Sequence, residues 1–495
     1  MEIETQKMFI NGEWVYAASG KTKDVINPAT GEVFARVTRG DREDARRAIQ
    51  AARKAFDEGS WSDGAATDRA ALLIKFADEM EARVDEIARI ETMNNGKTLT
   101  EASYDVYDSA ACLRYYAGIC TKPSGQTYSV PSPDVHAMTI REPIGVVGMI
   151  VAWNFPISLA MWKLAPALAA GNTIILKPAS ATPLSAIKLF EIMEHVGFPK
   201  GVVNLVLGGG SDVGDELAKN TDVDKIAFTG SIEAGQSVMR AAATNIKGIC
   251  LELGGKSPIV VFDDADFENA VDYAAFGMFY NQGEVCSASS RILIQDTIYD
   301  KFVKALVKVT KQIKLGNGLE EGVTMGPLVT KEHMEKVLAY IEKGKAEGAK
   351  VLVGGGRATE GELAKGYFVQ PTIFGDCTPD MTIVQEEIFG PVLCLQKFHT
   401  EQEAIELANG TTYGLAAGVF SKDIGKALRV VKKIRAGITW VNEFGPVYNE
   451  APWGGYKQSG IGRELGTYGF DEFTEIKQVN VLLKPEPTGW FGPVD

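Results

Sequence analysis

The sequence of 495 residues has no long apolar run and few cysteines or histidines. No apolar stretch approaches the roughly 20 residues that span a bilayer. The amino end, MEIETQK, lacks the basic-then-apolar pattern of a secretory signal. These absences predict a soluble, cytoplasmic protein with no membrane partner.

Basic residues are outnumbered and dispersed. The chain has 51 Lys and Arg against 64 Asp and Glu, a net charge of -13, and no basic cluster. Binding along a nucleic acid backbone depends on clustered Lys and Arg, so nucleic acid is not an expected partner. The 6 cysteines are scattered and none lies in a CxxC pair. This spacing excludes a disulfide framework, and we predict no metal site.

The length predicts about three domains rather than a small binding module. An Asn-Gly turn between alternating apolar residues predicts a hairpin over residues 8–15. Apolar residues spaced three and four apart predict amphipathic helices over 42–56 and 69–93. Residues 120–142 are rich in Thr, Ser, Pro and Val without helical period. They indicate an extended segment, with a strand pair as one form of it.

Short apolar strands alternate with helical patterns between residues 144 and 253. The expected strands are 144–151, 173–177, 202–207, 225–228 and 248–253. The expected helices are 157–170, 184–196, 213–219 and 233–243. This alternation predicts parallel βαβ units in a doubly wound sheet that binds ligands at the carboxyl ends of its strands. A second α/β pattern runs from 257 to about 468, with strands at 259–262, 292–295 and 437–441 and a helix over 298–313.

Three segments are candidates for binding a nucleotide. The fingerprint GxGxxG is absent, and Gly208-Gly209-Gly210 with Gly214 has the wrong spacing, so a plain tight turn is an equal explanation. Phe228-Thr229-Gly230-Ser231, followed by Gly235, lies between a strand and a helix, where free N–H groups bind a pyrophosphate. An ordinary Ser N-cap is its alternative. Lys177 ends a strand and either binds ribose or phosphate or is simply solvated.

Cys286 is the candidate nucleophile, because it follows a glycine-containing turn rather than lying in an apolar stripe. None of the four histidines lies in a glycine-rich or strand-end setting, which disfavours a Cys-His protease pair. A carboxylate is the remaining base. Glu252, in Leu251-Glu252-Leu253-Gly254-Gly255, ends the fifth strand among apolar residues, where burial raises the pKa of a carboxyl group.

With these motifs in place, the sequence resembles the aldehyde dehydrogenase superfamily over essentially its whole length. The motifs that carry the resemblance are ordered and specific. They are Trp153-Asn154-Phe155-Pro156, the strand end at Lys177, 228–235, LELGGK at 251–256, the Cys286 segment, Glu386-Glu387-Ile388-Phe389-Gly390-Pro391, and 453–457 through 462–465.

The resemblance implies two doubly wound α/β domains and a β oligomerisation arm. A Rossmann-like nucleotide-binding domain is expected over 1–122 and 143–253, and a catalytic domain over 254–469. The arm is expected over 123–142 and 470–495, where the alternation is strand-like. The implied assembly is a homo-oligomer, a dimer or a tetramer.

The resemblance also implies the chemistry. Cys286 attacks the aldehyde to give a thiohemiacetal, whose oxyanion is held by Asn154 and the Cys286 N–H. Hydride transfer to NAD or NADP leaves a thioester, which a water activated by Glu252 hydrolyses to the acid. Lys163 matches a lysine near the nucleophile, and Glu464 matches an acid that helps to carry protons. The implied cofactor-binding residues are Ile150, Trp153, Asn154, Lys177, Ala179, Ser180, Gly210, Phe228, Gly230, Ser231, Gly235, Leu253, Glu387 and Phe389.

Two residues depart from the commoner pattern of the family. Ser180 stands where many NAD-specific relatives have a Glu that binds the adenosine ribose and repels a phosphate. The departure predicts that NADP is accepted alongside NAD. Asn94 stands where relatives with a monovalent-cation site often have Asp, which puts a bound potassium or sodium ion in doubt.

The implied substrate tunnel is aromatic with one acid. Its residues are Asp108, Phe155, Met161, Trp162, Tyr280, Val447 and Trp453. A broad-range enzyme for aliphatic or aromatic aldehydes is one interpretation. The other is an amino- or betaine aldehyde, because Asp108 with Trp162 and Trp453 can hold a cationic head group.

Three other functions are alternatives to an aldehyde dehydrogenase that hydrolyses its thioester. A CoA-acylating dehydrogenase is disfavoured because Glu252 supplies the base that hydrolysis needs. A Cys-dependent esterase or amidase without hydride transfer leaves Lys177 and the glycine turn at 230–235 unexplained. A purely structural role predicts the loss of Cys286 or Glu252, and the chain has both.

Overall fold

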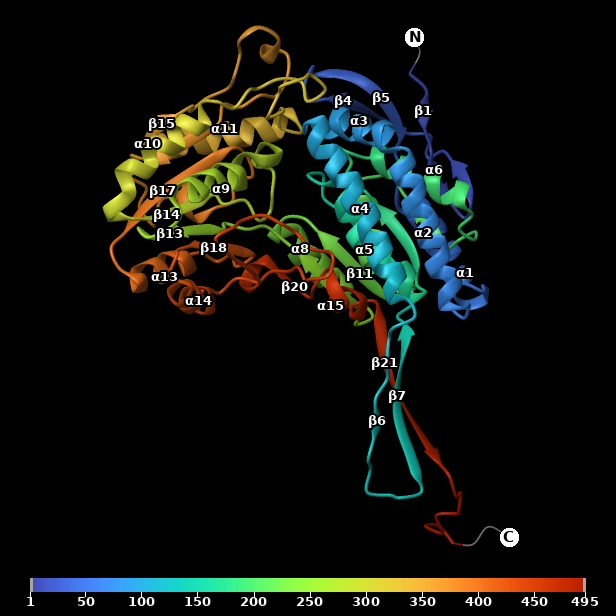
Figure 1. Cartoon of the computed structure of the whole chain (residues 1–495). Coiled ribbons are helices and arrows are strands. Elements are labelled where there is room, and N and C mark those ends of the chain that lie inside the picture. The colour runs from blue at the N-terminus through green and yellow to red at the C-terminus, as the bar shows by residue number, and fades with distance from the viewer. Residues whose placement is uncertain (1–2, 493–495) are drawn as a thin grey trace.

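The computed structural model describes residues 3–492 as two α/β bodies side by side, with a long β arm projecting from them (Figure 1). The first body is coloured blue to green and the second mainly yellow to orange. The predicted fold class is confirmed. Over the described range, no helix combines the length and apolarity that a membrane crossing needs.

A sheet of eight strands forms the centre of the first body, in the order β20-β12-β11-β8-β9-β10-β2-β3. Its central strands are parallel: β8 (Val146–Ile150), β9 (Thr173–Lys177), β10 (Val203–Leu205), β11 (Lys225–Thr229) and β12 (Gly248–Glu252). Strands covered on both faces read as apolar runs, which is why the sequence located all of them. Ile150 pairs in register with Lys177 and with Phe228, so these strand ends share one edge of the sheet.

Both edges of this sheet carry antiparallel strands. The predicted hairpin forms from β2 (Met8–Ile10) and β3 (Glu13–Val15), and β2 pairs with β10. Asn11 and Gly12, at the turn, have φ angles of 55° and 76°, as a tight hairpin turn requires. At the other edge β20 (Gly460–Ile461) pairs with β12. A segment from the range expected for the catalytic domain therefore adds a strand to the first sheet.

Helices pack around the first sheet. They are α1 (Arg42–Glu58), α2 (Ala66–Ala82), α3 (Val84–Asn95), α4 (Leu99–Ile119), α5 (Pro156–Ala170), α6 (Leu184–Val196), α7 (Asp215–Lys219), α8 (Ile232–Ala242) and α15 (Gly466–Asp471). Nearly every residue of α5 is buried, because this helix contacts α2, α4, α6 and the sheet. Its one lysine, Lys163, is therefore enclosed by protein.

The single helix predicted over 69–93 is wrong. The structure has two helices, α2 and α3, and they meet at Arg83, whose φ and ψ of -115° and 22° are not helical. The apolar periodicity continues across the break, so the spacing alone did not reveal it. Asp85 and Glu86, in the first turn of α3, are the local signal, since acidic residues favour a helix N-terminus.

The second body has a seven-stranded sheet in the order β15-β16-β17-β14-β13-β18-β19, in which β15 alone pairs antiparallel. Its strands are β13 (Pro258–Val261), β14 (Arg291–Gln295), β15 (Lys350–Val353), β16 (Thr372–Gly375), β17 (Val392–Phe398), β18 (Ala416–Phe420) and β19 (Ile438–Val441). Its helices are α9 (Phe267–Phe279), α10 (Tyr299–Thr310), α11 (Lys331–Ala346), α12 (Thr382–Gln385), α13 (Glu401–Asn409) and α14 (Ile424–Lys433). A small third sheet joins β1 (Thr5–Gln6), β5 (Glu32–Thr38) and β4 (Thr22–Asn27).

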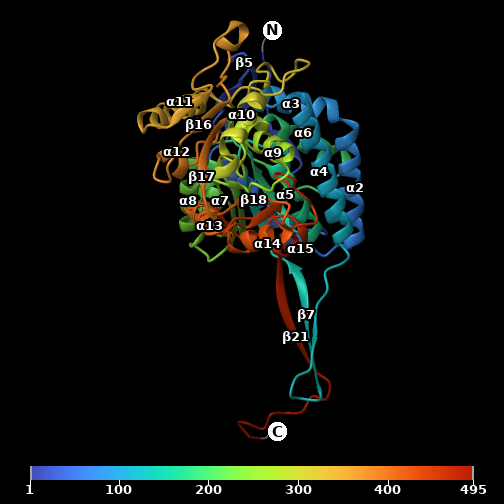
Figure 2. The ribbon, with the colours of Figure 1, turned by 60° about the vertical axis from the view of Figure 1, so that its left-hand side comes forward.

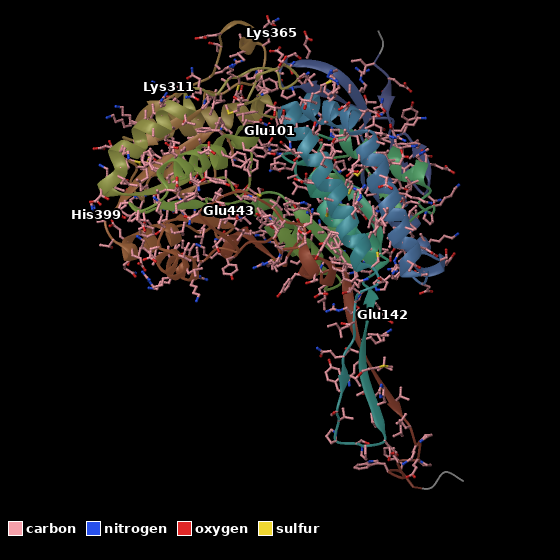
Figure 3. The ribbon with its side chains drawn as sticks, in the orientation of Figure 1. Glu101, Glu142, Lys311, Lys365, His399 and Glu443 are labelled. Carbon is pink, nitrogen blue, oxygen red and sulfur yellow. The ribbon has the colours of Figure 1, made fainter. Side chains whose placement is uncertain are left out.

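The arm is a three-stranded sheet that stands clear of both bodies in two views (Figures 1 and 2). β7 (Val135–Pro143) pairs along its whole length with β21 (Thr474–Leu482), and β6 (Thr127–Tyr128) pairs with β7. Glu142 marks its base in Figure 3. The strand pair predicted within 120–142 is confirmed, and the far end of the chain supplies its partner strand.

Candidate active site

Cys286 lies in a cavity of about 250 Å³ that residues from five separate segments line. The segments are 152–154, 229–231, 252–254, 333–336 and 387–389. The Cys286 side chain is partly exposed, whereas the other five cysteines are buried. The structure thus brings together Cys286, Glu252 and Asn154, which the sequence grouped by chemistry, with Trp153, Glu387 and Phe389.

Glu252 ends β12, and the residue is 4% exposed. Neither of its oxygens has a hydrogen-bond partner within residues 3–492. Burial, and then the neighbouring Glu464, raise the pKa of Glu252 well above its usual range. Burial also raises the pKa of the Cys286 thiol, and Glu252 adds to that effect. Both groups are therefore stronger bases when ionised than they would be in water.

Two glycines let the end of β12 approach its neighbours closely. A Cβ at Gly254 would lie 2.2 Å from Glu387 Oε2, and one at Gly255 would lie 2.3 Å from the Cys286 carbonyl oxygen. The Gly255 N–H donates to Glu387 Oε1 at 2.8 Å. Any larger side chain at these two positions would push Glu387 and the Cys286 segment away from Glu252.

Asn154 is buried directly before α5. Its Nδ2 donates to the carbonyl oxygen of Glu284 at 2.9 Å, two residues before Cys286. An amide nitrogen carries two hydrogens, so one of them stays free for an oxygen in the cavity. Asn154 is thereby anchored to the same segment that carries the thiol.

A buried lysine joins two residues at the back of the site. Lys163 Nζ donates to Thr229 Oγ1 at 2.6 Å and pairs with Glu464 Oε1 at 2.5 Å. Lys163 also opposes the rise in the pKa of Glu252. The structure therefore places Lys163 and Glu464 in one buried charged cluster with the candidate base.

The predicted cofactor residues fall into two cavities. Trp153, Asn154, Gly230, Ser231, Leu253, Glu387 and Phe389 line the cavity of Cys286. Ala179 and Ser180 line a second cavity, also of about 250 Å³, and Ser180 Oγ donates to the Gly208 carbonyl there at 2.8 Å. Ile150, Lys177 and Phe228 lie on the strand edge described above, Gly210 begins a short π-helical turn, and Gly235 is buried in α8.

Four basic residues that the sequence analysis did not single out, three cations and one histidine, line these cavities. His333 and Lys336 of α11 line the cavity of Cys286, and the His333 ring lies 4.9 Å from that of Trp153. Burial lowers the pKa of His333 to about 4, and its Nε2 lies 2.6 Å from the Phe389 carbonyl oxygen, so the neutral ring donates there. Lys23 and Arg39 line the second cavity. None is near the predicted motifs in sequence, so no local signal marked them.

No histidine lies near a glycine-rich or strand-end feature along the sequence, but the fold brings one histidine into the active site. His333 shares a cavity with Cys286. It does not restore a Cys-His pair, because its Nε2 is committed to Phe389 and its low pKa makes it a poor base.

The predicted tunnel residues form two aromatic pairs. Phe155 stacks on Tyr280 with ring centroids 6.3 Å apart, and Trp162 lies 5.5 Å from Trp453. Met161 is fully buried, and Val447 is partly exposed. Asp108 is exposed on α4, yet partial burial and then Asp105 raise its pKa. Burial raises the pKa of both Tyr115 and Cys112. Glu450, which the sequence did not single out, adds to both effects, and Glu464 and Asp108 add to that on Cys112.

Asn94 uses both ends of its side-chain amide. Its Nδ2 donates to the Ala181 carbonyl at 2.9 Å, and its Oδ1 accepts from the Leu184 N–H at 3.1 Å. The residue at this position therefore ties α3 to the loop before α6 through two neutral hydrogen bonds.

Comparison with known proteins agrees with this geometry. Residues 14–479 match the model of the aldehyde dehydrogenase family. A betaine aldehyde dehydrogenase of Bacillus subtilis is 52% identical over 98% of this chain and 99% of its own. Aminoaldehyde dehydrogenase 2, peroxisomal, of Pisum sativum is 44% identical over 99% of this chain and 98% of its own.

A solved structure is similar over the same length. The crystal structure of betaine aldehyde dehydrogenase from Staphylococcus aureus, in complex with NAD+, superposes with a TM-score of 0.97 at 48% identity. It covers 99% of this chain and 97% of its own. This chain belongs to the aldehyde dehydrogenase family.

Proposed function

We propose that this aldehyde dehydrogenase oxidises an aldehyde to a carboxylic acid through a covalent adduct on Cys286. The observation that carries the proposal is the meeting of Cys286, Asn154 and Glu252 in one cavity with Glu387 and Phe389. The family supplies the reaction class. The geometry supports the role proposed for each residue.

A nicotinamide dinucleotide fits the residues present. Ser231 caps α8, whose free N–H groups favour a pyrophosphate. Glu387 uses Oε1 on the Gly255 N–H, which leaves Oε2 for a ribose hydroxyl. Trp153 and Phe389, with ring centroids 5.2 Å apart, line the same cavity as Glu252. When bound, the nicotinamide accepts a hydride.

In the first step Cys286 Sγ, as the thiolate, forms a bond with the aldehyde carbon while the π bond of the carbonyl breaks. The carbonyl oxygen becomes an oxyanion, which accepts hydrogen bonds from the free hydrogen of Asn154 Nδ2 and from the Cys286 N–H. The C–H bond of this thiohemiacetal then breaks with loss of a hydride, the oxyanion becomes a carbonyl oxygen again, and the adduct is now a thioester.

Hydrolysis then releases the acid. Glu252 removes a proton from a water whose oxygen attacks the thioester carbon, and the C–S bond breaks to return the thiolate. Because neither Glu252 oxygen is bonded to protein within the described residues, both are available to water. The buried Lys163–Glu464 pair acts electrostatically on Glu252, and Glu464 can accept the proton that Glu252 takes from the water.

A panel of aliphatic, aromatic and amino-aldehydes, run with each cofactor, tests the reaction class by the absorbance of reduced nicotinamide. We expect stoichiometric acid formation with cofactor reduction. Ester hydrolysis by Cys286 without any reduction would instead support a thiol esterase.

We further propose that NADP is used alongside NAD. Two cations, Lys23 and Arg39, line the second cavity together with Ser180, and Lys177 directly precedes its lining residues Pro178 and Ala179. After the larger effect of burial, Lys23 lowers the pKa of Lys177 and Arg39 lowers that of Lys23. Burial lowers the pKa of Lys177 to about 8. An extra phosphate relieves this repulsion, and Ser180 brings no opposing charge.

Ser180→Glu should lower kcat/KM for NADP by at least about tenfold and change the value for NAD by less than about threefold, because the new carboxylate repels only the phosphate. Ser180→Gln is the neutral control of equal size. Steady-state kinetics with both cofactors measure this. A hundredfold preference of the unchanged enzyme for NAD would contradict dual use.

We propose an amino- or betaine aldehyde as the substrate. The support is the acid Asp108 among the proposed tunnel residues and their two aromatic pairs, whose rings can face a cation, together with the names of the relatives above. A broad-range aldehyde dehydrogenase is the alternative, since the aromatic pairs alone suit any apolar chain.

Asp108→Asn should raise the KM for an ω-aminoaldehyde about three- to tenfold, because an exposed carboxylate contributes a modest attraction to a cation. The KM for a neutral aldehyde of equal length should stay within about twofold. Equal changes for the two substrates would favour the broad-range alternative.

We propose that the arm joins copies of the chain into a dimer or tetramer. We also propose that the nucleotide-binding domain spans 1–122 and 143–253, the catalytic domain 254–469 and the arm 123–142 and 470–495. The support is that β21 is a largely exposed strand at the edge of its sheet, with Ile476 65% exposed, so its backbone is available to pair with another copy. Light scattering of the protein and of Ile476→Lys measures the assembly.

A further inference from the structure

The turn before Cys286 has an unusual backbone. Asn281 has φ and ψ of 47° and 43°, and Gln282 has 46° and 29°. Two successive residues other than glycine are thus in the left-handed region, which side chains disfavour. Such a conformation persists only where the surroundings hold it in place.

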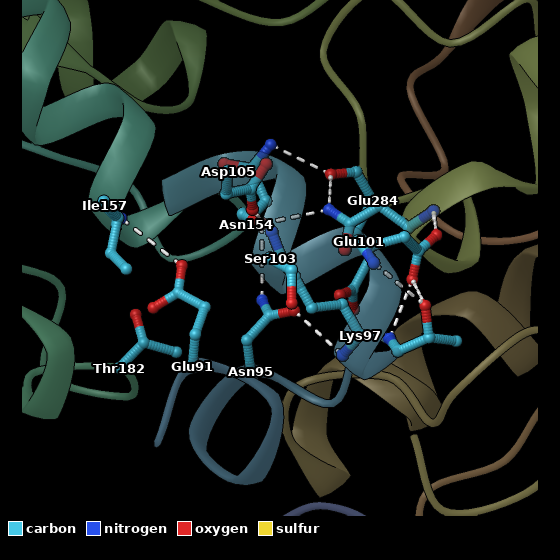
Figure 4. Close-up of polar contacts among 12 residues, drawn as sticks. Glu91, Asn95, Lys97, Glu101, Ser103, Asp105, Asn154, Ile157, Thr182 and Glu284 are labelled. Atoms are coloured by element: carbon cyan, nitrogen blue, oxygen red, sulfur yellow. Dashed lines mark hydrogen bonds and ion pairs between the residues drawn. The ribbon is translucent and has the colours of Figure 1, made fainter. Parts of the chain in front are cut away.

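Glu101 holds this turn from the other body of the protein. Its Oε1 accepts from the Asn281 N–H at 2.8 Å, across 180 residues of sequence. Its Oε2 accepts from the N–H and hydroxyl of Thr98, at 2.7 and 2.8 Å, which caps α4. Glu101 lies where the first and second bodies meet in Figure 3, and Figure 4 shows the polar contacts around it in close-up.

The Asn281 side chain carries this restraint into the active site. Its Nδ2 lies 2.9 Å from the Asn154 carbonyl oxygen and 3.2 Å from that of Glu284. The Asn154 amide itself donates to the same Glu284 oxygen. Asn281 therefore joins the backbone of the oxyanion donor to the segment that bears Cys286, and all of these groups are buried.

We propose that Asn281, pinned by Glu101, is a positioning residue that sets the distance between the Asn154 amide and the Cys286 thiol. Asn281 is not among the residues that line the cavity of Cys286. Its effect is exerted through Asn154, whose free hydrogen must meet the oxyanion to within a fraction of an ångström to stabilise it. This inference rests on the proposed roles of Cys286 and Asn154.

Asn281→Ala tests the proposal, because it removes the contacts of Nδ2 with Asn154 and Glu284, together with the contact that Oδ1 accepts from Gln282. The single-turnover rate of nicotinamide reduction should fall about 30- to 300-fold, in the range found when an oxyanion donor is lost or misplaced. The Kd of the cofactor should change by less than about twofold. Any isotope effect from aldehyde that carries deuterium on the carbonyl carbon should become smaller, because C–S bond formation, the step that the oxyanion donors assist, breaks no C–D bond. Glu101→Gln, of equal size, should give a smaller fall of the same kind, because an amide can satisfy only one of its two contacts.

Thr98→Val is the matched control. It weakens the same helix cap without touching Asn281, so it should lower Tm comparably to Glu101→Gln while the reduction rate stays within about twofold. An unchanged rate in Asn281→Ala, or an equal loss of rate in Thr98→Val, would overturn the proposal. If Asn281→Ala does not fold, the comparison of Glu101→Gln with Thr98→Val decides. Failure of the proposed function itself is recognised separately, because Cys286→Ala would then still reduce the cofactor.

Discussion

Replacing Cys286 with alanine should abolish aldehyde oxidation, lowering kcat by about 10⁴-fold or more, as loss of a nucleophile does in other covalent mechanisms. The expectation follows from the position of Cys286, which is the one partly exposed thiol of the described chain and shares a cavity with Asn154 and Glu252. Without a sulfur atom no thiohemiacetal forms, so no carbon is prepared to lose a hydride. Steady-state reduction of the nicotinamide measures the loss.

Cys120→Ala is the matched control, because Cys120 is buried at the end of α4 and outside the cavity. Its activity should stay within about twofold of the unchanged enzyme. Cofactor affinity should survive in Cys286→Ala, since only the thiol is removed. Residual oxidation above about one per cent of the original kcat would contradict the role of Cys286.

Glu252→Gln should uncouple reduction from turnover. The thiohemiacetal and the thioester still form, so each active site should release about one equivalent of reduced cofactor in a burst. The following steady rate should be about 10²- to 10⁴-fold slower than normal, because no base activates the hydrolytic water. Intact-protein mass spectrometry should detect the acyl group on the enzyme.

The pH dependence of hydrolysis provides a second check on Glu252. Only the carboxylate acts as a base, and burial raises its pKa well above the usual range. The hydrolytic rate should therefore keep rising with pH above the range in which an ordinary carboxyl group is already ionised, and this dependence should be lost in Glu252→Gln. Glu475→Gln, on the exposed arm, is the matched control and should leave both burst and steady rate unaltered. Normal turnover without a burst in Glu252→Gln would assign the base to another residue.

Local sequence patterns predicted the parts of the fold that depend on local physics. All five central strands of the first sheet are continuous apolar runs, and the Asn11-Gly12 turn allowed only a hairpin. The helix break at Arg83 was not predicted, because apolar periodicity indicates which face of a helix is buried and not where its backbone bends. β20 escaped because two residues are too short to show alternation.

The candidate site divides in the same way. Cys286 and Glu252 stand out because each is in an unfavourable setting for its type, a thiol after a glycine turn and a carboxylate among apolar residues. His333, Lys23 and Arg39 gave no such signal, because their settings along the chain are ordinary. Glu101 and Asn281 became meaningful only when a hydrogen bond across 180 residues joined them.

The last segments of the chain return to the first body, and this has a consequence for synthesis. Glu464 meets Lys163 across 301 residues, the Asn172 amide bonds to Phe473 across the same separation, and β20 completes a sheet whose other strands end by Glu252. The body made first on the ribosome therefore cannot close until almost the whole polypeptide has emerged. Nascent chains that stop before residue 460 should hold an unfinished sheet edge and an unpaired buried lysine, so they depend on chaperones and have no catalytic activity.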